Sequence, residues 1–220
     1  MTTNVRENTL RVLDQIRETA LRIGRDPASI ELIAVTKTVV ADRIREAVNA
    51  GVRNIGENRL QEALPKREQL RDLDLTWHFI GHLQTNKARK AVENFDWIQC
   101  LDRLELAAKL NQSAAKPLPV LAEVKLHDEP NKSGMEEADL PAFIEQLTNY
   151  PRLQLRGLMA VPPFFEDPEE VRPYFQRLRQ LADRFRLSEL SMGMSHDFQV
   201  AIEEGATMVR VGTALFGERR

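Results

Sequence analysis

The feature that most constrains the fold of this chain is a regular alternation of short apolar runs with stretches of helical periodicity. Each apolar run has the length and the aliphatic content of a strand buried on both faces, and helical spacing follows it. The links are too short for any connection other than a parallel crossover. Eight such runs occur, at about residues 30–35, 52–56, 77–80, 97–100, 119–124, 153–159, 190–192 and 207–211.

Eight strand and helix units predict an α/β fold, a single (β/α)8 TIM barrel. An open doubly wound sheet is the competing architecture, but residues 50–56 and 204–212 share the order helix, glycine, strand, glycine, which favours the barrel. Asn4 and Glu7 predict a capped N-terminal helix at about residues 4–24. Pro65 predicts an interruption or kink in the helix near residues 58–70, and Thr85 is expected to cap the next helix.

Composition limits the class of protein. The 220 residues carry 31 Lys and Arg against 33 Asp and Glu, so neither nucleic acid nor an anionic membrane is an expected partner. No linker or low-complexity segment divides the chain, and we expect residues 1–220 to form one domain. The single cysteine, Cys100, fits a reducing compartment, and no stretch resembles a leader or a membrane span. We therefore expect a cytoplasmic protein, with no metal site.

A lysine ends the first predicted strand. Lys37 follows the apolar run through Val35, at the edge of the core, where partial desolvation disfavours the ammonium form and frees the amine as a nucleophile. The alternative is that the methylene groups of the Lys37 side chain pack against the protein while its ammonium group reaches water. In a barrel, however, the loops at the carboxyl ends of the strands form the working face, and Lys37 would lie there.

Two other loops on that face predict an anion site. The seventh strand leads into Ser191-Met192-Gly193-Met194-Ser195, and the eighth into Arg210-Val211-Gly212-Thr213. Glycines permit close backbone approach, Ser195 and Thr213 carry hydroxyls, and helix N-termini attract phosphate. The alternative is that Ser195 only caps the helix after it and that Gly212 only eases a turn.

A lysine amine that faces a phosphate site is the pattern expected for pyridoxal 5'-phosphate (PLP), which has an aldehyde and a phosphate. Arg210 alternates with Val209 and Val211, so it points into the barrel if the valines face the helices. Beside the pyridine nitrogen, an arginine would keep that nitrogen unprotonated and the ring a weak electron sink. The alternative for Arg210 is a structural ion pair.

Several motifs resemble those of the pyridoxal phosphate homeostasis protein family over nearly the whole chain. They are Ala34-Val35-Thr36-Lys37, Ile55-Gly56-Glu57-Asn58, His78-Phe79-Ile80-Gly81-His82-Leu83-Gln84-Thr85-Asn86-Lys87, Asn131-Lys132-Ser133-Gly134-Met135, Ser191-Met192-Gly193-Met194-Ser195-His196-Asp197-Phe198 and Val209-Arg210-Val211-Gly212-Thr213. The resemblance implies a barrel of the alanine racemase N-terminal domain type.

The same resemblance implies roles for single residues. Lys37 matches the Schiff-base lysine, and Lys132 matches a loop lysine that could act as a secondary amine. Many relatives carry a second lysine and a proline after the Schiff-base lysine, where this chain has Val39 and Val40. The residues expected to bind the cofactor are Lys37, Asn58, His78, Met159, Ser191, Gly193, Met194, Ser195, Arg210, Gly212 and Thr213.

The remaining question is whether a bound cofactor would do chemistry. A racemase needs a base on each face of its substrate, commonly a lysine and a tyrosine, yet Tyr150 and Tyr174 are not expected at the barrel mouth. No second domain is expected to close the site. We therefore expect a monomer that holds PLP for vitamin B6 and amino-acid homeostasis without turnover, with PLP-dependent apoenzymes as candidate recipients. The alternatives are a PLP-dependent amino-acid racemase or related enzyme, and a PLP-responsive regulatory partner.

Overall fold

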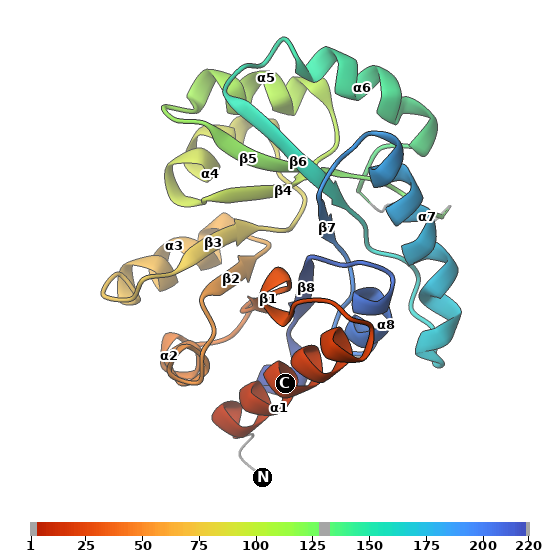
Figure 1. The fold of residues 1–220 in the computed structure, drawn as a ribbon. Helices are drawn as coiled ribbons and strands as arrows, with labels where there is room; N and C mark the ends of the chain where they lie inside the picture. Colours follow the sequence, from red (N-terminus) through yellow and green to blue (C-terminus); the bar gives the residue numbers. More distant parts are fainter. Residues whose placement is uncertain (1–3, 128–132, 219–220) are drawn as a thin grey trace.

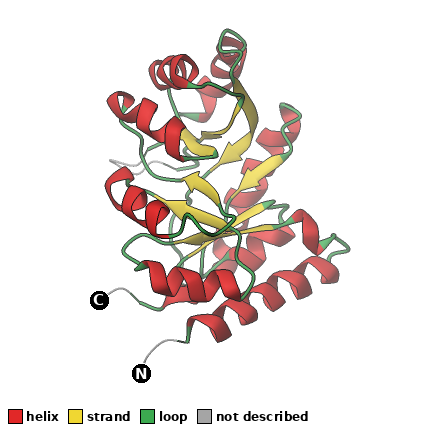
Figure 2. Ribbon diagram, turned by 90° about the vertical axis from the view of Figure 1, so that its left-hand side faces the viewer, coloured by secondary structure: helices red, strands yellow, loops and turns green. Residues whose placement is uncertain are grey.

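The structure is a computed structural model that describes residues 4–127 and 133–218. Parallel strands close into a barrel in the order of the sequence, and helices surround it (Figures 1 and 2). The strands are β1 (Glu31–Val35), β2 (Asn54–Glu57), β3 (Thr76–Phe79), β4 (Trp97–Leu101), β5 (Leu118–Glu123), β6 (Leu153–Met159), β7 (Glu189–Ser191) and β8 (Met208–Val211). The predicted (β/α)8 barrel is thus confirmed against the open sheet, because β1 pairs with β8.

The helices follow the strands as the periodicity predicted. They are α1 (Val5–Arg22), α2 (Ala41–Asn49), α3 (Leu60–Gln69), α4 (Ala88–Asn94), α5 (Leu104–Ser113), α6 (Leu140–Leu147), α7 (Arg172–Arg184), α8 (Phe198–Glu203) and α9 (Thr213–Phe216). Short 3-10 helices are η1 (Pro27–Ser29), η2 (Thr85–Lys87), η3 (Glu137–Asp139) and η4 (Pro168–Val171). Within the described ranges, no helix combines the length and the apolar character that crossing a membrane requires.

The seam between β1 and β8 positions the predicted site. Ile33 lies opposite Arg210 and Ala34 opposite Val211, in a parallel register. Parallel pairing places the carboxyl ends of both strands at the same end of the barrel. The turn after β1 and the loop after β8 are therefore neighbours in space, although they are distant in the sequence.

Helix α1 lies outside the barrel and covers this seam. The Asn4 side chain accepts a hydrogen bond from the Glu7 amide at 3.1 Å, so the predicted capping contact is confirmed. Val12 and Ile16 on its inner face are buried, and Asn8 Nδ2 donates to the Leu215 carbonyl at 3.2 Å. Helix α1 thus packs on the short helix α9.

Two local predictions differ from the helices that form. Helix α3 runs from Leu60 to Gln69 and contains Pro65, so the predicted interruption is wrong, while the alternative of a kink stays a prediction. Thr85 does not cap the helix after β3, because a turn of 3-10 helix intervenes and α4 begins only at Ala88. The Thr85 hydroxyl instead accepts a hydrogen bond from Arg103 Nη2 at 3.2 Å. A tertiary contact therefore uses the hydroxyl that local sequence assigned to a cap.

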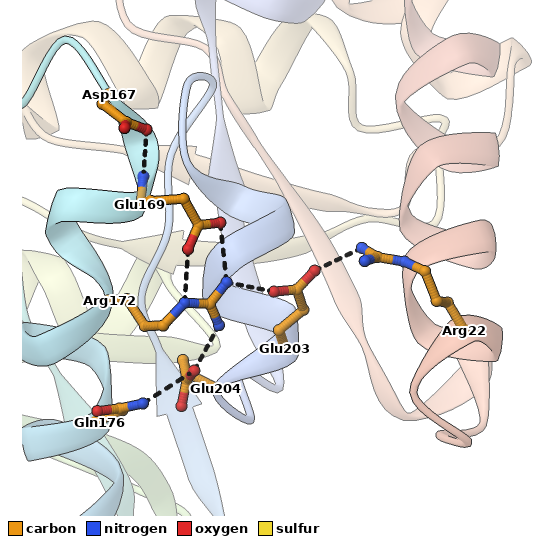
Figure 3. A network of polar contacts seen from close by, with 7 residues as sticks. All are labelled: Arg22, Asp167, Glu169, Arg172, Gln176, Glu203 and Glu204. Atoms are coloured by element: carbon orange, nitrogen blue, oxygen red, sulfur yellow. Dashed lines mark hydrogen bonds and ion pairs between the residues drawn. The ribbon is translucent and has the colours of Figure 1, made fainter.

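A network of charged side chains ties three helices together on the outside of the barrel (Figure 3). Arg172, the first residue of α7, contacts Glu169 at 2.7 Å, Glu203 at 2.6 Å and Glu204 at 2.5 Å. Glu203 also pairs with Arg22 at the end of α1 at 2.5 Å. Together these bonds raise the pKa of Arg172, which stays charged. The network links the start of α7 to α8 and α1.

Candidate functional site

The turn that carries Lys37 begins directly beyond β1. Thr36 is buried, and its amide donates to the Gly56 carbonyl at 3.0 Å, which extends the pairing of β1 with β2 by one residue. Lys37 is half-buried, and Thr38 follows with a φ of 63°, a conformation that residues other than glycine seldom adopt. The Val39 amide closes the turn on the Thr36 carbonyl at 2.9 Å. Lys37 therefore projects from a tight turn at the carboxyl end of the barrel.

Ser195 joins the two predicted anion loops. Its Oγ accepts hydrogen bonds from the amide of Gly212 at 3.1 Å and from the amide of Ala214 at 3.2 Å. These amides belong to the start of α9, so Ser195 caps a helix across the barrel mouth and not the helix α8 that follows it. In the described part of the chain the Ser195 hydroxyl acts only as an acceptor, so its hydrogen can donate to an anion. We call Ser195 and the Gly212 and Ala214 amides the anion cradle.

The surroundings of the two glycines show how the anion cradle is placed. Gly193 has a φ of 85°, and a Cβ atom there would lie 2.5 Å from the Cβ of Ala201 in α8. Gly212 lies beside Val35, since a Cβ atom at Gly212 would be 3.4 Å from Val35 Cβ. The anion cradle is thus adjacent to the last residue of β1, two residues before Lys37. Met194 is half-buried beside the cradle, and Thr213 is exposed.

Arg210 points into the barrel, as its alternation with the valines predicted. Its side chain is buried, and it donates to Ser191 Oγ at 2.6 Å and to the Ala160 carbonyl at 2.9 Å. Burial lowers the pKa of Arg210 to about 10, against the opposing influence of Glu123 and Asp197. Arg210 therefore remains a cation near neutral pH. Within residues 4–127 and 133–218, no carboxylate forms an ion pair with it.

A chain of buried hydrogen bonds runs from Arg210 through the interior of the barrel. Ser191 Oγ donates to Gln99 Oε1 at 2.7 Å, and Gln99 Nε2 lies 3.0 Å from His78 Nδ1. His78 Nε2 lies 3.2 Å from Asn54 Oδ1. Burial lowers the pKa of His78 to about 3, so the ring is neutral, and these partners assign the proton to Nε2. Every donor then points the same way, from Arg210 on β8 to Asn54 on β2.

These hydrogen bonds change how two of the predicted site residues, Ser191 and His78, are interpreted. Ser191 contacts Arg210 directly, while His78 is linked to it through Gln99 and Ser191, and both Ser191 and His78 are fully buried in the barrel. Gln99 was not among the predicted residues. The signal for it was a polar residue within the apolar run of β4, a position where a side chain must find a partner.

Asn58 and Met159 complete the predicted set on other strands. Met159 ends β6 and is buried, in register with Ser191 on β7. Asn58 follows β2, and its Oδ1 is buried without a hydrogen-bond partner among the described residues. Gly81 allows this placement, because a Cβ atom there would lie 2.6 Å from the Asn58 carbonyl oxygen. Asn58 lines a cleft of about 540 Å³ between the loops after β2 and β3, which His82 and Gln84 share.

Sequence reasoning also missed two buried carboxylates. Glu57 ends β2, and its Oε1 pairs with Lys66 Nζ of α3 at 2.6 Å and accepts from Thr36 Oγ1 at 2.6 Å. Glu123 ends β5, where burial and the charge of Asp102 raise its pKa to about 7, against the opposing charge of Arg210. Both carboxylates lie at the carboxyl end of the barrel. Lys132, predicted as a secondary amine, lies outside the described residues.

A further cavity lies on the outside of the barrel, away from these residues. A groove of about 1100 Å³ between α4 and α5 is lined by helix-surface residues such as Glu93 and Lys109. In the described part of the chain, no cluster of histidine, cysteine and carboxylate side chains could hold a metal ion. The side chains predicted to bind an anion and a carbonyl group lie at the carboxyl ends of β1, β7 and β8.

Comparison with known proteins identifies the family. A family model described as "Alanine racemase, N-terminal domain" matches residues 12–220. The "Pyridoxal phosphate homeostasis protein" of Aquifex aeolicus is 46% identical over 226 residues, which cover 99% of this chain and 99% of the relative. The protein of the same name from Pseudomonas aeruginosa is 47% identical over 220 residues, covering 98% of this chain and 96% of the relative.

A solved structure extends the likeness to three dimensions. PipY of Synechococcus elongatus PCC7942, solved with PLP bound, is 44% identical and superposes with a TM-score of 0.83 over 94% of this chain and 100% of that one. The two proteins are therefore similar in sequence, in length and in fold. The chain belongs to the alanine racemase N-terminal domain family and, within it, to the pyridoxal phosphate homeostasis proteins.

Proposed function

We propose that this protein binds PLP through Lys37 and serves PLP homeostasis. The observation that carries the proposal is the position of the anion cradle beside the last residue of β1, with Gly212 next to Val35. An amine and an anion site then lie at one end of one barrel. The names of the relatives and the PLP in the PipY structure support the same ligand.

The side chains present fit this cofactor. When bound, PLP supplies an aldehyde that condenses with a primary amine and a pyridine ring that withdraws electrons. Lys37 would form a bond from Nζ to the aldehyde carbon, with loss of water. Ser195, held by the Gly212 and Ala214 amides, would donate its hydroxyl hydrogen to the phosphate beside the N-terminus of α9. The buried, unpartnered Oδ1 of Asn58 offers an acceptor on the same rim.

Arg210 supports a role without turnover. Its guanidinium is a donor at neutral pH, so beside a pyridine nitrogen it would leave that nitrogen unprotonated and limit electron withdrawal. Tyr150 precedes β6 and so lies toward the amino end of the barrel. Tyr174, in the first turn of α7, packs on Phe165 with the ring centroids 5.7 Å apart. The position of Tyr150 thus does not suit the second base that a racemase needs.

The finer points of the proposal concern the state and place of the protein. We propose that residues 1–220 act as one PLP-binding domain, as a monomer in the cytoplasm, and that PLP-dependent apoenzymes receive the cofactor. Cys100 is a free, buried thiol among the described residues, which is consistent with a reducing compartment.

The test is covalent trapping. Protein incubated with PLP should turn yellow, and borohydride should remove the colour and add the mass of the reduced cofactor at Lys37. Lys37→Ala should take up no covalent cofactor. Mass on another lysine in the wild-type protein would reject the site. Steady turnover of a small D- or L-amino acid that disappears in Lys37→Ala would replace the homeostasis role with a racemase or related activity.

A further inference from the structure

Thr36, the residue before Lys37, is held at each of its polar groups. Its amide donates to the Gly56 carbonyl at 3.0 Å, and its Oγ1 donates to Glu57 Oε1 at 2.6 Å. Its carbonyl accepts from Lys66 Nζ at 2.6 Å. Because the carbonyl, the hydroxyl and the amide are all engaged, the peptide plane from which Lys37 extends has little freedom to rotate.

Thr38, on the other side of Lys37, is held by the same helix. Its amide donates to Glu62 Oε2 of α3 at 3.1 Å. Glu62 and Lys66 are four residues apart in the helix and therefore lie on the same face. Thr38 has a φ of 63°, a strained conformation for threonine that persists only where its surroundings impose it. Helix α3 thus contacts the turn on both sides of Lys37.

Stability alone does not explain this arrangement. The Lys66–Glu57 pair is almost fully buried, with 12% and 0% of the side chains exposed, and the second carboxylate oxygen, Glu57 Oε2, has no partner among the described residues. Buried ion pairs often contribute little net stability, because desolvation offsets their attraction, and an unsatisfied oxygen adds to the cost. What the pair does provide is a fixed position for Thr36.

We infer that Glu57, Glu62 and Lys66 are positioning residues that set the turn of Lys37 in advance of cofactor attachment. The inference rests on the proposed function of Lys37. A turn fixed in advance lowers the entropic cost of placing the amine against the aldehyde. A fixed turn gives no advantage to a ligand that binds the anion cradle without reacting with the Lys37 amine. Comparing the two kinds of ligand therefore distinguishes a positioning role of these residues from a role in the stability of the whole protein.

The experiment compares two cofactor forms on two variants. Thr36→Val removes the hydroxyl that bonds to Glu57, and Glu62→Ala removes the acceptor for the Thr38 amide. PLP can attach to Lys37, whereas pyridoxine 5'-phosphate has an alcohol in place of the aldehyde and cannot. Each variant should slow covalent attachment of PLP and weaken its retention about fivefold to tenfold. The affinity for pyridoxine 5'-phosphate, from fluorescence titration, should stay within about twofold of the wild type.

Matched variants make the result specific. Thr36→Ser and Glu62→Gln keep a hydroxyl and an acceptor, and they should restore attachment. Glu68→Ala removes an exposed carboxylate from the same helix, where it pairs with Arg71 at 2.8 Å, and should behave as wild type. Equal weakening of both ligands in Thr36→Val and Glu62→Ala would overturn the inference, as would attachment rates equal to those of Glu68→Ala. Failure of the wild-type protein to attach PLP at Lys37 would instead overturn the proposed function.

Discussion

Glu123 should make the protein less stable as the pH rises toward 8. Its carboxyl group lies at the end of β5, 8% exposed, and its pKa is raised from 4.5 to about 7. At about 1.4 kcal/mol for each pKa unit, this difference corresponds to roughly 3 kcal/mol of folding free energy. The cause is burial first and the charge of Asp102 second, while Arg210 acts in the opposite direction.

The direction in which stability changes with pH follows from proton binding. Between pH 4.5 and 7 the folded protein holds a proton on Glu123 that the unfolded chain has released, so raising the pH favours unfolding. The contribution is complete below pH 4.5 and is lost as the pH rises through 7. His78 acts with the opposite sign, since its pKa is lowered from 6.5 to about 3 and its contribution is lost as the pH falls through 3. The pH dependence of the unfolding free energy of the wild-type protein therefore contains contributions from both Glu123 and His78.

A matched substitution separates the contribution of Glu123 to the pH dependence of stability from that of His78. Glu123→Gln mimics the protonated acid and cannot ionise, so the variant should match the wild type at pH 4.5 and exceed it by up to about 3 kcal/mol at pH 8. Urea unfolding of both proteins without cofactor, at several pH values in this range, measures the difference. Glu18→Gln, an exposed change on α1, serves as the control. A difference that does not vary with pH would refute the reasoning.

Two further predictions concern the anion cradle and the outer helices. Ser195→Ala should weaken PLP retention about tenfold or more, because it removes a donor to a charged group; equilibrium dialysis would measure this, and retention equal to wild type would place the phosphate elsewhere. Arg172→Ala should lower the unfolding free energy by about 1–2 kcal/mol at low salt and by less in 1 M NaCl. The matched change Arg89→Ala, in a pair with 82% and 51% exposed side chains, should have little effect in the same unfolding assay.

Sequence patterns predicted the fold because the barrel repeats a local signal. Each strand is apolar since both of its faces are covered, and each helix carries one apolar side, so eight local signals add up to one topology. The positions of Lys37 and Ser195 followed from that topology, because parallel strands present their carboxyl ends together. The strand boundaries shifted by one or two residues, and Thr85 does not cap the helix after β3, because its hydroxyl accepts a hydrogen bond from Arg103 instead.

The polar contacts inside the barrel could not be predicted in the same way. Gln99 bonds to Ser191, which is 92 residues away in the sequence, and Lys66 bonds to Thr36, 30 residues away. Such pairs depend on register and on which face of a strand or helix is turned inward, and no local period encodes them. The raised pKa of Glu123 likewise depends on burial and on neighbours from other strands. A polar residue in an apolar run signals that a partner exists, but not which residue it is.

The seam between β1 and β8 has a consequence for synthesis of the protein. A chain that has emerged from the ribosome only as far as β6 already contains Lys37, yet it lacks Ser195 and the α9 amides. Lys37 is thus made early, and the residues proposed to hold the phosphate are made last. Until the final strand joins the first, these two parts of the proposed site cannot meet, so a nascent chain should not retain the cofactor at Lys37.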